Sequence, residues 1–511
     1  MKRYEKLFFF VLLLWMHGIV GNAENKDVLN VAIAVNYSWN GIEPEKLPFI
    51  EKLTEEANVD IKWSIYDQND EWSRQLPLYM QEKKQPDIYI NCFSESEFIE
   101  YQDKFMPLDE IMEKYAPDIE KAYREDAQLR SYSEQRDGRI YGLAVRKPYR
   151  PSIWQKWIIN QEWLDRLNLK VPETWEELKF VLRAFRDQDA NGNGDINDEI
   201  PLVFCSFLAR SYILTGGTGS YSSSDKGLIC DKGEFIYLPN TEQWRETISF
   251  IHELYEEGLL CEESATMNYA ELQNLGRNGT ESRVGASIGW SANEILGPER
   301  EKEYRIMDQP IAREGEVGIY NKQFYDGLTY ENHCAQISSA CKNPEAAMRF
   351  LNLFYREDYS VQAYYGSYDV GVKKNEDNTY TVLTPDTYGN EEWQRINSMV
   401  DNGLYYFPKE LEHRIEAPES IMKILDDEDK FRGKEELTDT VALLRMKIDP
   451  KKLIESDQIL DSLENISLKA AIKFMVQGIT EETWNEFQNE LYAADLEKLI
   501  TIYQDAYKIN K

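Results

Sequence analysis

The sequence predicts an α/β protein made of two lobes, followed by a helical C-terminal extension. Strand-like and helix-like stretches alternate through the first 145 residues, as they do in βαβ units. Residues 147–151 break this regularity, and a second alternation starts after them. Beyond Pro408 almost no strand pattern remains. With 511 residues, 42% of them apolar, the chain is long enough to bury more than one core.

The first lobe is expected to hold a largely parallel sheet. Residues 28–35 form an apolar run of strand length, and residues 59–65 alternate apolar and polar side chains. Further strands are predicted at 87–91 and 140–145, and helices at 45–57 and 108–115.

The second lobe begins with a predicted strand at 157–159 and shows clear helix-start signals. Asn160 is placed to cap one helix, and Thr174 with Glu177 has the spacing of a capping box. Thr241 precedes another helical pattern, and Asn343 is followed by proline at the first helical position.

The last hundred residues are expected to be helical. The predicted helices cover residues 420–425, 437–444, 463–476, 481–491 and 495–509. We expect residues 24–146 and 309–355 to form the first lobe. Residues 147–308 and 356–511 are expected to form the second lobe and its extension.

The N-terminus has the three regions of a secretory signal peptide. Lys2, Arg3 and Lys6 precede an apolar run at residues 7–16, and small residues follow at 21–23. The run is short for a membrane span, which needs about 20 apolar residues. We therefore expect residues 1–23 to be a signal peptide and the protein to be exported; an uncleaved anchor is the alternative.

Composition excludes several classes of function. With 58 basic and 91 acidic residues the chain carries a formal charge of −33, which would repel nucleic acid and an anionic membrane surface. Four histidines without metal-ligand spacing exclude a histidine-based metal cluster. No nucleophile elbow, catalytic triad signature or zinc motif is found, so we expect no enzyme activity.

The sharpest local signal is a loop that resembles a calcium-binding loop. Counted from Asp189, oxygen-bearing side chains fall at alternate positions, with glycine at the sixth, where such a loop turns sharply. The twelfth position is Ile200 rather than glutamate, so a neighbouring acid has to supply the last carboxylate. The predicted calcium ligands are Asp189, Asn191, Asn193, Asp195, Asn197, Asp198 and Glu199. A solvated Asn/Gly turn is the alternative.

Aromatic and polar residues follow several predicted strands, where open α/β sheets bind ligands. Aromatic faces with a few polar groups suit carbohydrate, although each ring taken alone is as easily a core residue. The predicted ligand-binding residues are Asn36, Tyr37, Trp39, Ser94, Glu95, Arg146, Tyr149, Arg150, Trp154 and Trp290. Arg146, Lys147 and Arg150 would suit an acidic sugar, or else pair with the chain's own carboxylates.

Taken in order, these segments resemble the extracellular solute-binding proteins of sugar ABC transporters, family 1, which includes maltose-binding protein. The likeness is greatest to the long branch of lipoprotein and alginate-oligosaccharide binders. It is carried by residues 137–143, 157–164, 171–177, the 189–199 loop, 343–347 and 484–507.

The resemblance implies a two-lobed periplasmic-binding-protein fold (type II) that closes by hinge motion over an oligosaccharide held between the lobes. It implies a monomer that delivers its ligand to ABC permease subunits, with a structural Ca²⁺. Trp290 resembles a tryptophan that packs on sugar. Many relatives carry a lipid-bearing cysteine after the apolar run, whereas no cysteine precedes Cys92 here. A glycoside hydrolase or a sensory receptor on the same fold are the alternatives.

Overall fold

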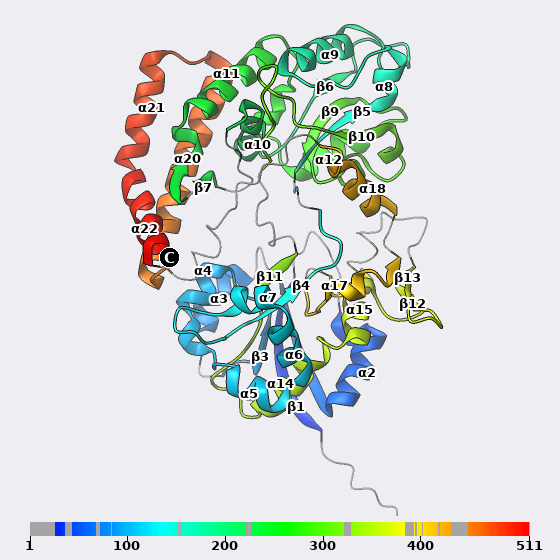
Figure 1. Cartoon of the computed structure of the whole chain (residues 1–511), viewed down its shortest axis with the longest axis vertical. Coiled ribbons are helices and arrows are strands. Elements are labelled where there is room, and N and C mark those ends of the chain that lie inside the picture. The colour runs from blue at the N-terminus through cyan, green and yellow to red at the C-terminus, as the bar shows by residue number, and fades with distance from the viewer. Residues whose placement is uncertain are drawn as a thin grey trace, which may run out of the picture.

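The computed structural model shows two lobes, one above the other in Figure 1. It describes residues 26–35, 43–67, 72–82, 84–151, 153, 155–220, 222, 226–231, 233–320, 329–383, 393, 396–400, 402–416, 419–431 and 448–509. The predicted signal peptide and the helix predicted at 437–444 lie outside these ranges. Within them, no helix combines the length and the apolar character that crossing a membrane requires.

The first lobe is built on a five-stranded sheet with the order β2-β1-β3-β11-β4. β1 (Asp27–Val35) runs parallel to β2 (Val59–Asp67) and β3 (Ile88–Ile90). β11 (Tyr330–Ile337) lies antiparallel to β3 and to β4 (Leu143–Arg146). The carboxyl ends of β1, β3 and β4 therefore meet at one edge, which faces the second lobe (Figure 1).

Helices cover both faces of this sheet and complete the first core. They are α2 (Pro48–Ala57), α3 (Ser73–Tyr79), α4 (Glu95–Glu100), α5 (Asp109–Tyr115), α6 (Pro117–Glu125), α7 (Ala127–Ser133), α14 (Pro344–Leu353) and α15 (Glu357–Tyr365). The apolar sides of α2 and α14 pack on the buried face of β1, whose Val31 and Ile33 are almost fully enclosed.

The segment after α14 corrects the predicted division of the chain. Residues 356–416 were expected in the second lobe, but Tyr359, Val361 and Tyr405 are buried in the same apolar cluster as β1. The segment also forms a small sheet of β12 (Val372–Lys374), β13 (Tyr380–Val382) and β14 (Ile415–Glu416), next to α17 (Lys409–Glu412). The first lobe consequently extends to Glu416. Residues 309–320, also expected in the first lobe, lie instead against the second, where the N–H groups of Ala312 and Ile319 donate to the carbonyls of Gly217 and Gly216.

The second lobe has a four-stranded sheet with the order β10-β5-β9-β6. β5 (Lys156–Asn160) lies antiparallel to both β10 (Tyr304–Met307) and β9 (Val284–Gly289), and β6 (Ile200–Leu202) runs parallel to β9. Because of these directions, β5 starts and β9 ends at the edge that faces the first lobe.

Helices and a hairpin surround this sheet. The helices are α8 (Gln161–Arg166), α9 (Trp175–Asp187), α10 (Phe207–Thr215), α11 (Glu242–Glu256), α12 (Tyr269–Arg277), α13 (Ala292–Leu296) and α18 (Glu419–Glu428), and the hairpin joins β7 (Leu228–Asp231) to β8 (Glu234–Tyr237). Asn160 caps α8, and Thr174 forms the predicted reciprocal capping box with Glu177.

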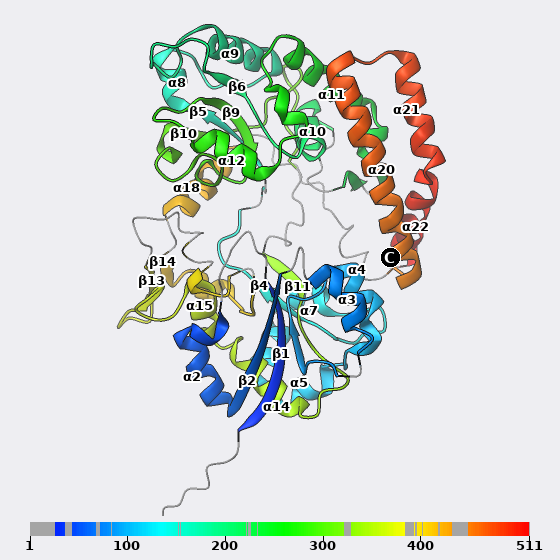
Figure 2. The ribbon, with the colours of Figure 1, turned by 180° about the vertical axis from the view of Figure 1, so that it is seen from behind.

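Three long helices complete the chain: α20 (Pro450–Gln477), α21 (Glu481–Ala493) and α22 (Leu496–Ile509). They stand beside the second lobe, and α20 packs along α11 (Figure 2). The N-terminal end of α20 reaches down to α4 of the first lobe. One apolar cluster runs from the second lobe through α20 to Phe98 and Ile99 of α4.

Candidate functional site

The two facing sheet edges and the segments that link them define the candidate site. The chain passes from β4 to β5 through residues 147–155, which run between the lobes in Figure 1. It returns between β10 and β11, and passes upward again between β14 and α18. Side chains at the end of β4 in the first lobe are therefore held opposite those at the start of β5 and the end of β9 in the second.

At the edge of the second lobe, Trp290 follows the last residue of β9 and is half-buried. The Lys156 ammonium lies 4.3 Å from the centre of its ring, in the geometry of a cation–π contact. Gly289, directly before Trp290, lies close to α13: a Cβ there would be 2.2 Å from Ile295 Cδ1, so a larger residue would have to displace that side chain. The indole is thus positioned by β9, which it follows, and by Lys156 of β5.

Lys156 is itself part of a buried ion pair. Its Nζ lies 3.5 Å from Glu428 Oε1, and the two side chains are 0% and 3% exposed. The same carboxylate accepts a hydrogen bond from the backbone N–H of Ile153 at 3.3 Å. Burial lowers the pKa of Lys156 to about 8, and the Glu428 carboxylate opposes that shift. Through this pair, α18 is fixed against the first crossing segment and β5.

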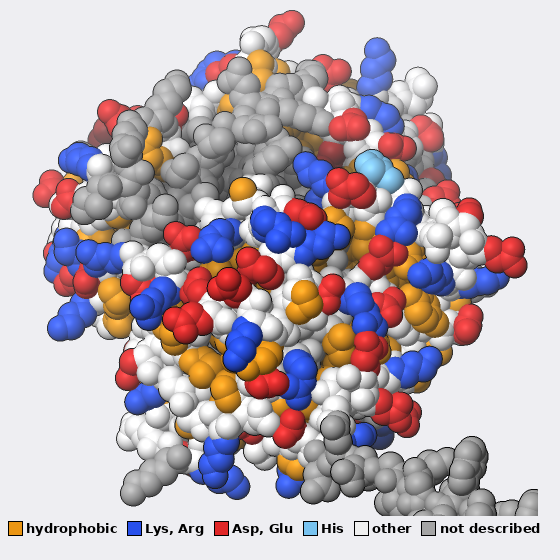
Figure 3. Space-filling view, turned by 60° about the horizontal axis from the view of Figure 1, so that its bottom comes forward, with side chains coloured by type: hydrophobic (Ala, Val, Ile, Leu, Met, Phe, Trp, Pro, Cys, Tyr) orange, Lys and Arg blue, Asp and Glu red, His pale blue; other side chains and the backbone are white. Residues whose placement is uncertain are grey.

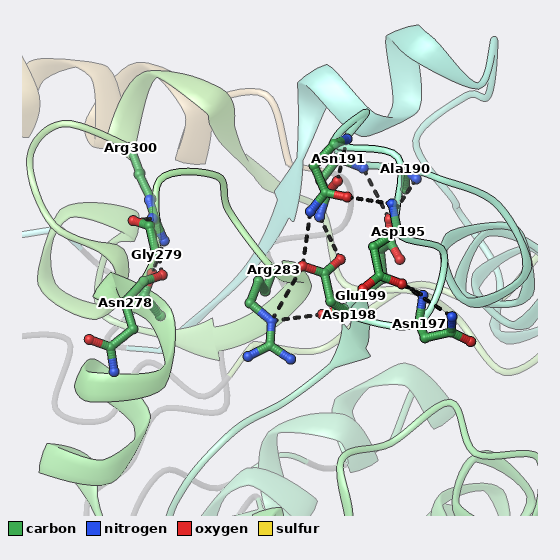
Figure 4. Close-up of polar contacts among 12 residues, drawn as sticks. Ala190, Asn191, Asp195, Asn197, Asp198, Glu199, Asn278, Gly279, Arg283 and Arg300 are labelled. Carbon is green, nitrogen blue, oxygen red and sulfur yellow. Dashed lines mark hydrogen bonds and ion pairs between the residues drawn. The ribbon is translucent and has the colours of Figure 1, made fainter.

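Arg210 provides a second cation at this edge. It lies in the N-terminal half of α10, is 8% exposed, and its Nε donates to the carbonyl of Ile288 at 3.1 Å. Burial lowers its pKa, while the Glu294 carboxylate acts in the opposite direction. Arg300, the other deeply buried arginine of this lobe, donates instead to three carbonyls (Figure 4).

At the edge of the first lobe, Arg146 and Tyr149 make contacts within the protein. The Arg146 guanidinium pairs with Glu412, donates to the carbonyl of Phe407, and has its Nε 4.0 Å from Asp126 Oδ2. The Tyr149 hydroxyl donates to the carbonyls of Glu412 and, at 2.8 Å, Ile415. Both side chains therefore tie the first crossing segment to the region around α17.

The remaining predicted ligand residues have varied surroundings. Ser94 caps α4 in a capping box with Glu97, and Glu95 lies in the first turn of that helix. Arg150 is half-buried. Asn36, Tyr37, Trp39 and Trp154 lie outside the described residues. Contact with a ligand stays a prediction for all of these positions.

The calcium-like loop joins α9 to β6 and folds around its own side-chain oxygens (Figure 4). Asp189 Oδ2 accepts from the N–H of Gly194 at 3.0 Å, so the first and sixth positions are brought together. Oδ1 atoms of Asn191, Asn193 and Asp195 each accept from the N–H two residues on, at 2.9, 2.7 and 3.1 Å. Their oxygens are consequently turned into the loop.

Two carboxylate oxygens of this loop are buried without any partner among the described residues: Asp189 Oδ1 and Glu199 Oε2. Leaving an ionised oxygen without a partner costs free energy, which a bound cation would offset. Burial also raises the pKa of Glu199. Hard oxygen donors of this kind are the ligands that Ca²⁺ prefers, so the residues fit the predicted ion.

The contacts in the loop also distinguish Asp198 from Glu199, the two acids that could each supply the last carboxylate ligand. Both Asp198 oxygens accept from amide groups, of Asn191 and Asn193, at 2.9 Å, and Arg283 Nε lies 3.8 Å away. Glu199 uses only Oε1, which accepts from the N–H groups of Ala190 and Asn191. Over the described residues, no three His, Cys, Asp or Glu side chains gather as a metal site. Asparagine oxygens would thus complete the donor set.

Sequence reasoning missed Lys156, Arg210 and Glu428 as residues of the site. Lys156 directly precedes the predicted strand 157–159, and a lysine next to an apolar stretch is the one signal that marks a partner in the fold. Glu428 lies in an acidic helix where nothing distinguishes it from its neighbours. Its partner is more than 250 residues away in the chain.

Comparison with known proteins finds relatives along almost the whole chain. No protein-family model matches it. It is 22% identical over 505 residues to the fructooligosaccharide ABC transporter substrate-binding protein FusA of Streptococcus pneumoniae, covering 92% of this chain and 88% of FusA. It is also 22% identical to the polygalacturonan/rhamnogalacturonan-binding protein YtcQ of Bacillus subtilis, covering 73% of this chain and 71% of that protein.

Solved structures agree with the model over nearly the full length. An extracellular solute-binding protein from Bifidobacterium longum subsp. infantis superposes with a TM-score of 0.83 at 23% identity, covering 95% of this chain and 99% of that one. An EF-hand mutant of FusA with fructo-nystose gives 0.81 at 20% identity, with 95% and 100% covered. The alginate-binding protein AlgQ2 without calcium gives 0.70 at 16% identity, with 95% and 98% covered. These matches confirm the predicted resemblance and two-lobed fold.

Proposed function

We propose that this protein is an exported solute-binding protein that captures an oligosaccharide between its lobes and delivers it to an ABC importer. The observation that carries the proposal is the half-buried Trp290 at the edge of the second-lobe sheet, beside charged hydrogen-bonding groups and opposite the first lobe. A flat apolar ring flanked by polar groups suits the two kinds of surface on a sugar. The relatives named for fructooligosaccharide and pectin fragments support this class of ligand.

The proposed binding step is hinge closure without chemistry. Three chain crossings, between β4 and β5, β10 and β11, and β14 and α18, join two lobes that are each built on a separate sheet, and such an arrangement can close around a ligand by hinge motion. The ligand would be held by Trp290 and by polar groups of both edges, and permease subunits would meet the closed form.

The test is a thermal-shift screen of the mature protein against oligosaccharides, with each glycan recovered afterwards. A ligand at 100 times its Kd adds about 2.7 kcal/mol to the stability of the bound form, which raises Tm by several degrees. A shift with the glycan recovered intact supports a binding protein. Cleavage of the glycan would make it an enzyme, and no shift with any glycan would contradict the proposal.

Trp290→Ala is expected to weaken binding about tenfold, because a stacked aromatic ring is lost, while the unliganded melting point changes little. Trp63→Ala is the matched control, since Trp63 is a half-buried tryptophan in β2 whose ring contacts Phe350 in the first lobe. Isothermal titration calorimetry measures both variants. Equal loss of affinity in the two variants would show that Trp290 is not part of the binding site.

We propose further that the 189–199 loop binds a structural Ca²⁺. The unpartnered oxygens of Asp189 and Glu199 support this, as does the EF-hand named in FusA. Asp189, Asn191, Asn193, Asp195 and Glu199 are the proposed side-chain ligands. The ion would brace the connection between α9 and β6.

A further inference from the structure

We infer that the ligand is an uncharged oligosaccharide, because the cations at the two facing edges are already engaged within the protein, three of them in ion pairs with its carboxylates and Arg210 with a backbone carbonyl. The inference rests on the proposed function and narrows its class of ligand. The relatives leave this choice open, since their names include both fructooligosaccharides and polygalacturonan.

In the first lobe, two of the three cations that the sequence offered to an acidic sugar, Arg146 and Lys147, are paired. Arg146 lies against Glu412 and Asp126 with its side chain only 6% exposed. Lys147 Nζ is 2.8 Å from Glu331 Oε2, with 13% of the lysine side chain exposed. A ligand carboxylate would have to displace these partners and leave them unpaired, which costs more than an exposed ion pair returns.

In the second lobe, Lys156 is paired with Glu428 and fully buried. The Arg210 guanidinium is also buried, and its Nε donates to the carbonyl of Ile288 at 3.1 Å. Both cations of this edge are therefore buried and bonded within the protein, where an acidic ligand would have to displace those contacts.

Over both edges, the three ion-paired cations, Arg146, Lys147 and Lys156, lie against four carboxylates, those of Asp126, Glu331, Glu412 and Glu428. Arg150 and Glu95 are the remaining charged residues predicted to face the ligand. With this one cation and one carboxylate included, the carboxylates still outnumber the cations by one. The chain as a whole carries a net charge of −33, which makes the surrounding electrostatic potential negative. A uronate is repelled by such a field, whereas a hydroxyl group both donates and accepts and suits an edge of mixed charge.

The experiment compares matched tetrasaccharides that differ only in the carboxylate: 1,4-linked galactose and 1,4-linked galacturonate, with kestose and a mannose tetramer as further neutral probes. Titration calorimetry is run at about 20 mM and about 500 mM NaCl. We expect a neutral glycan to bind with a Kd that changes less than about twofold between these salts, and galacturonate to bind at least about 100-fold more weakly.

Tight binding of galacturonate that weakens at high salt would overturn the inference and leave the proposed function standing. No binding of any glycan in the wider screen would overturn the proposed function and the inference together. The two failures are therefore distinguishable.

A variant that removes a neutralising carboxylate tests the cause directly. Glu331→Gln is expected to strengthen galacturonate binding about fivefold or more, because the Lys147 ammonium then loses the carboxylate that lies 2.8 Å away. Glu345→Gln is the control, since Glu345 pairs with Arg349 on a helix that covers the first-lobe sheet. Glu331 is partly exposed, so the fold should tolerate its replacement. A folded Glu331→Gln without a gain for galacturonate contradicts the inference.

Discussion

Burial of Lys156 makes the free energy of unfolding depend on pH. Its pKa is lowered from the ordinary 10.5 to about 8 in the folded protein. Between these values the unfolded chain binds more protons than the folded one, so the free energy of unfolding rises with pH. We expect Lys156 to contribute a rise of up to about 1.4 kcal/mol per pH unit from about pH 8 to pH 10. Urea denaturation at a series of pH values measures it.

The control for this prediction replaces both partners, Lys156→Met with Glu428→Leu, which removes the titrating group without leaving a buried charge alone. The pH-dependent rise between about pH 8 and pH 10 should be smaller in the double variant. An identical pH profile in the two proteins would mean that Lys156 titrates as it does in water.

Single residues of the site divide into those that the sequence could identify and those it could not. Trp290 was found because the glycine-rich strand before it has a local pattern. Arg146 and Tyr149 also follow a strand, yet their partners around α17 lie more than 250 residues further along the chain. Nothing in the local sequence shows that Glu412 takes up the charge of Arg146. Composition gave the sign of the overall charge but not which ions are paired.

At the scale of an element, the 189–199 loop predicts a calcium-dependent stability. Asp189→Ala and Glu199→Gln should each lower the melting temperature measured in calcium and remove its dependence on a chelator. Calcium at 100 times its Kd would stabilise the folded protein by about 2.7 kcal/mol, which raises the melting temperature of a lobe of this size by several degrees. Differential scanning calorimetry with calcium and with EGTA measures the difference.

Asp198→Asn is the matched control for the loop, because both Asp198 oxygens are already occupied by asparagine amides. It should keep most of the calcium dependence. Wild-type melting curves that coincide with and without chelator would contradict the calcium proposal. If Asp198→Asn lost the calcium dependence and Glu199→Gln kept it, the ligand would be Asp198 rather than Glu199.

Elements with local signals were predictable and elements without them were not. The capping box of α9 and the caps of α8 and α14 are set by residues three positions apart, which the sequence displays directly. The small sheet of β12, β13 and β14 depends on pairing between Tyr380 and Ile415, so no local pattern marks it. For the same reason the boundary of the first lobe was misplaced: α15 is buried in the apolar cluster of the first lobe and packs on α2, which is a long-range contact.

At the scale of the whole molecule, the proposed closure predicts a change in size. The radius of gyration measured by small-angle X-ray scattering should fall when a bound glycan brings the two sheet edges together. Trp290→Ala at the same glycan concentration should scatter like the unliganded protein. A radius that stays constant at saturation would show that ligand binds without movement of the lobes.

The face of the first lobe seen in Figure 3 has mixed charge over the described residues. Acidic and basic side chains alternate there, with small apolar patches between them. Both signs occur in neighbouring ion pairs such as Arg349 with Asp27 and Glu345. The excess of acidic residues is therefore not concentrated on the described part of this face.

The contact between α20 and α4 makes the molecule asymmetric in how it can open. α20 is built into the second lobe along α11, yet its first turn touches the first lobe, where Arg136 lies 3.4 Å from Asp449. Any swing of one lobe against the other has to pivot at this contact or break it. Under the proposed function, a glycan would consequently enter between the lobes from the side away from α20.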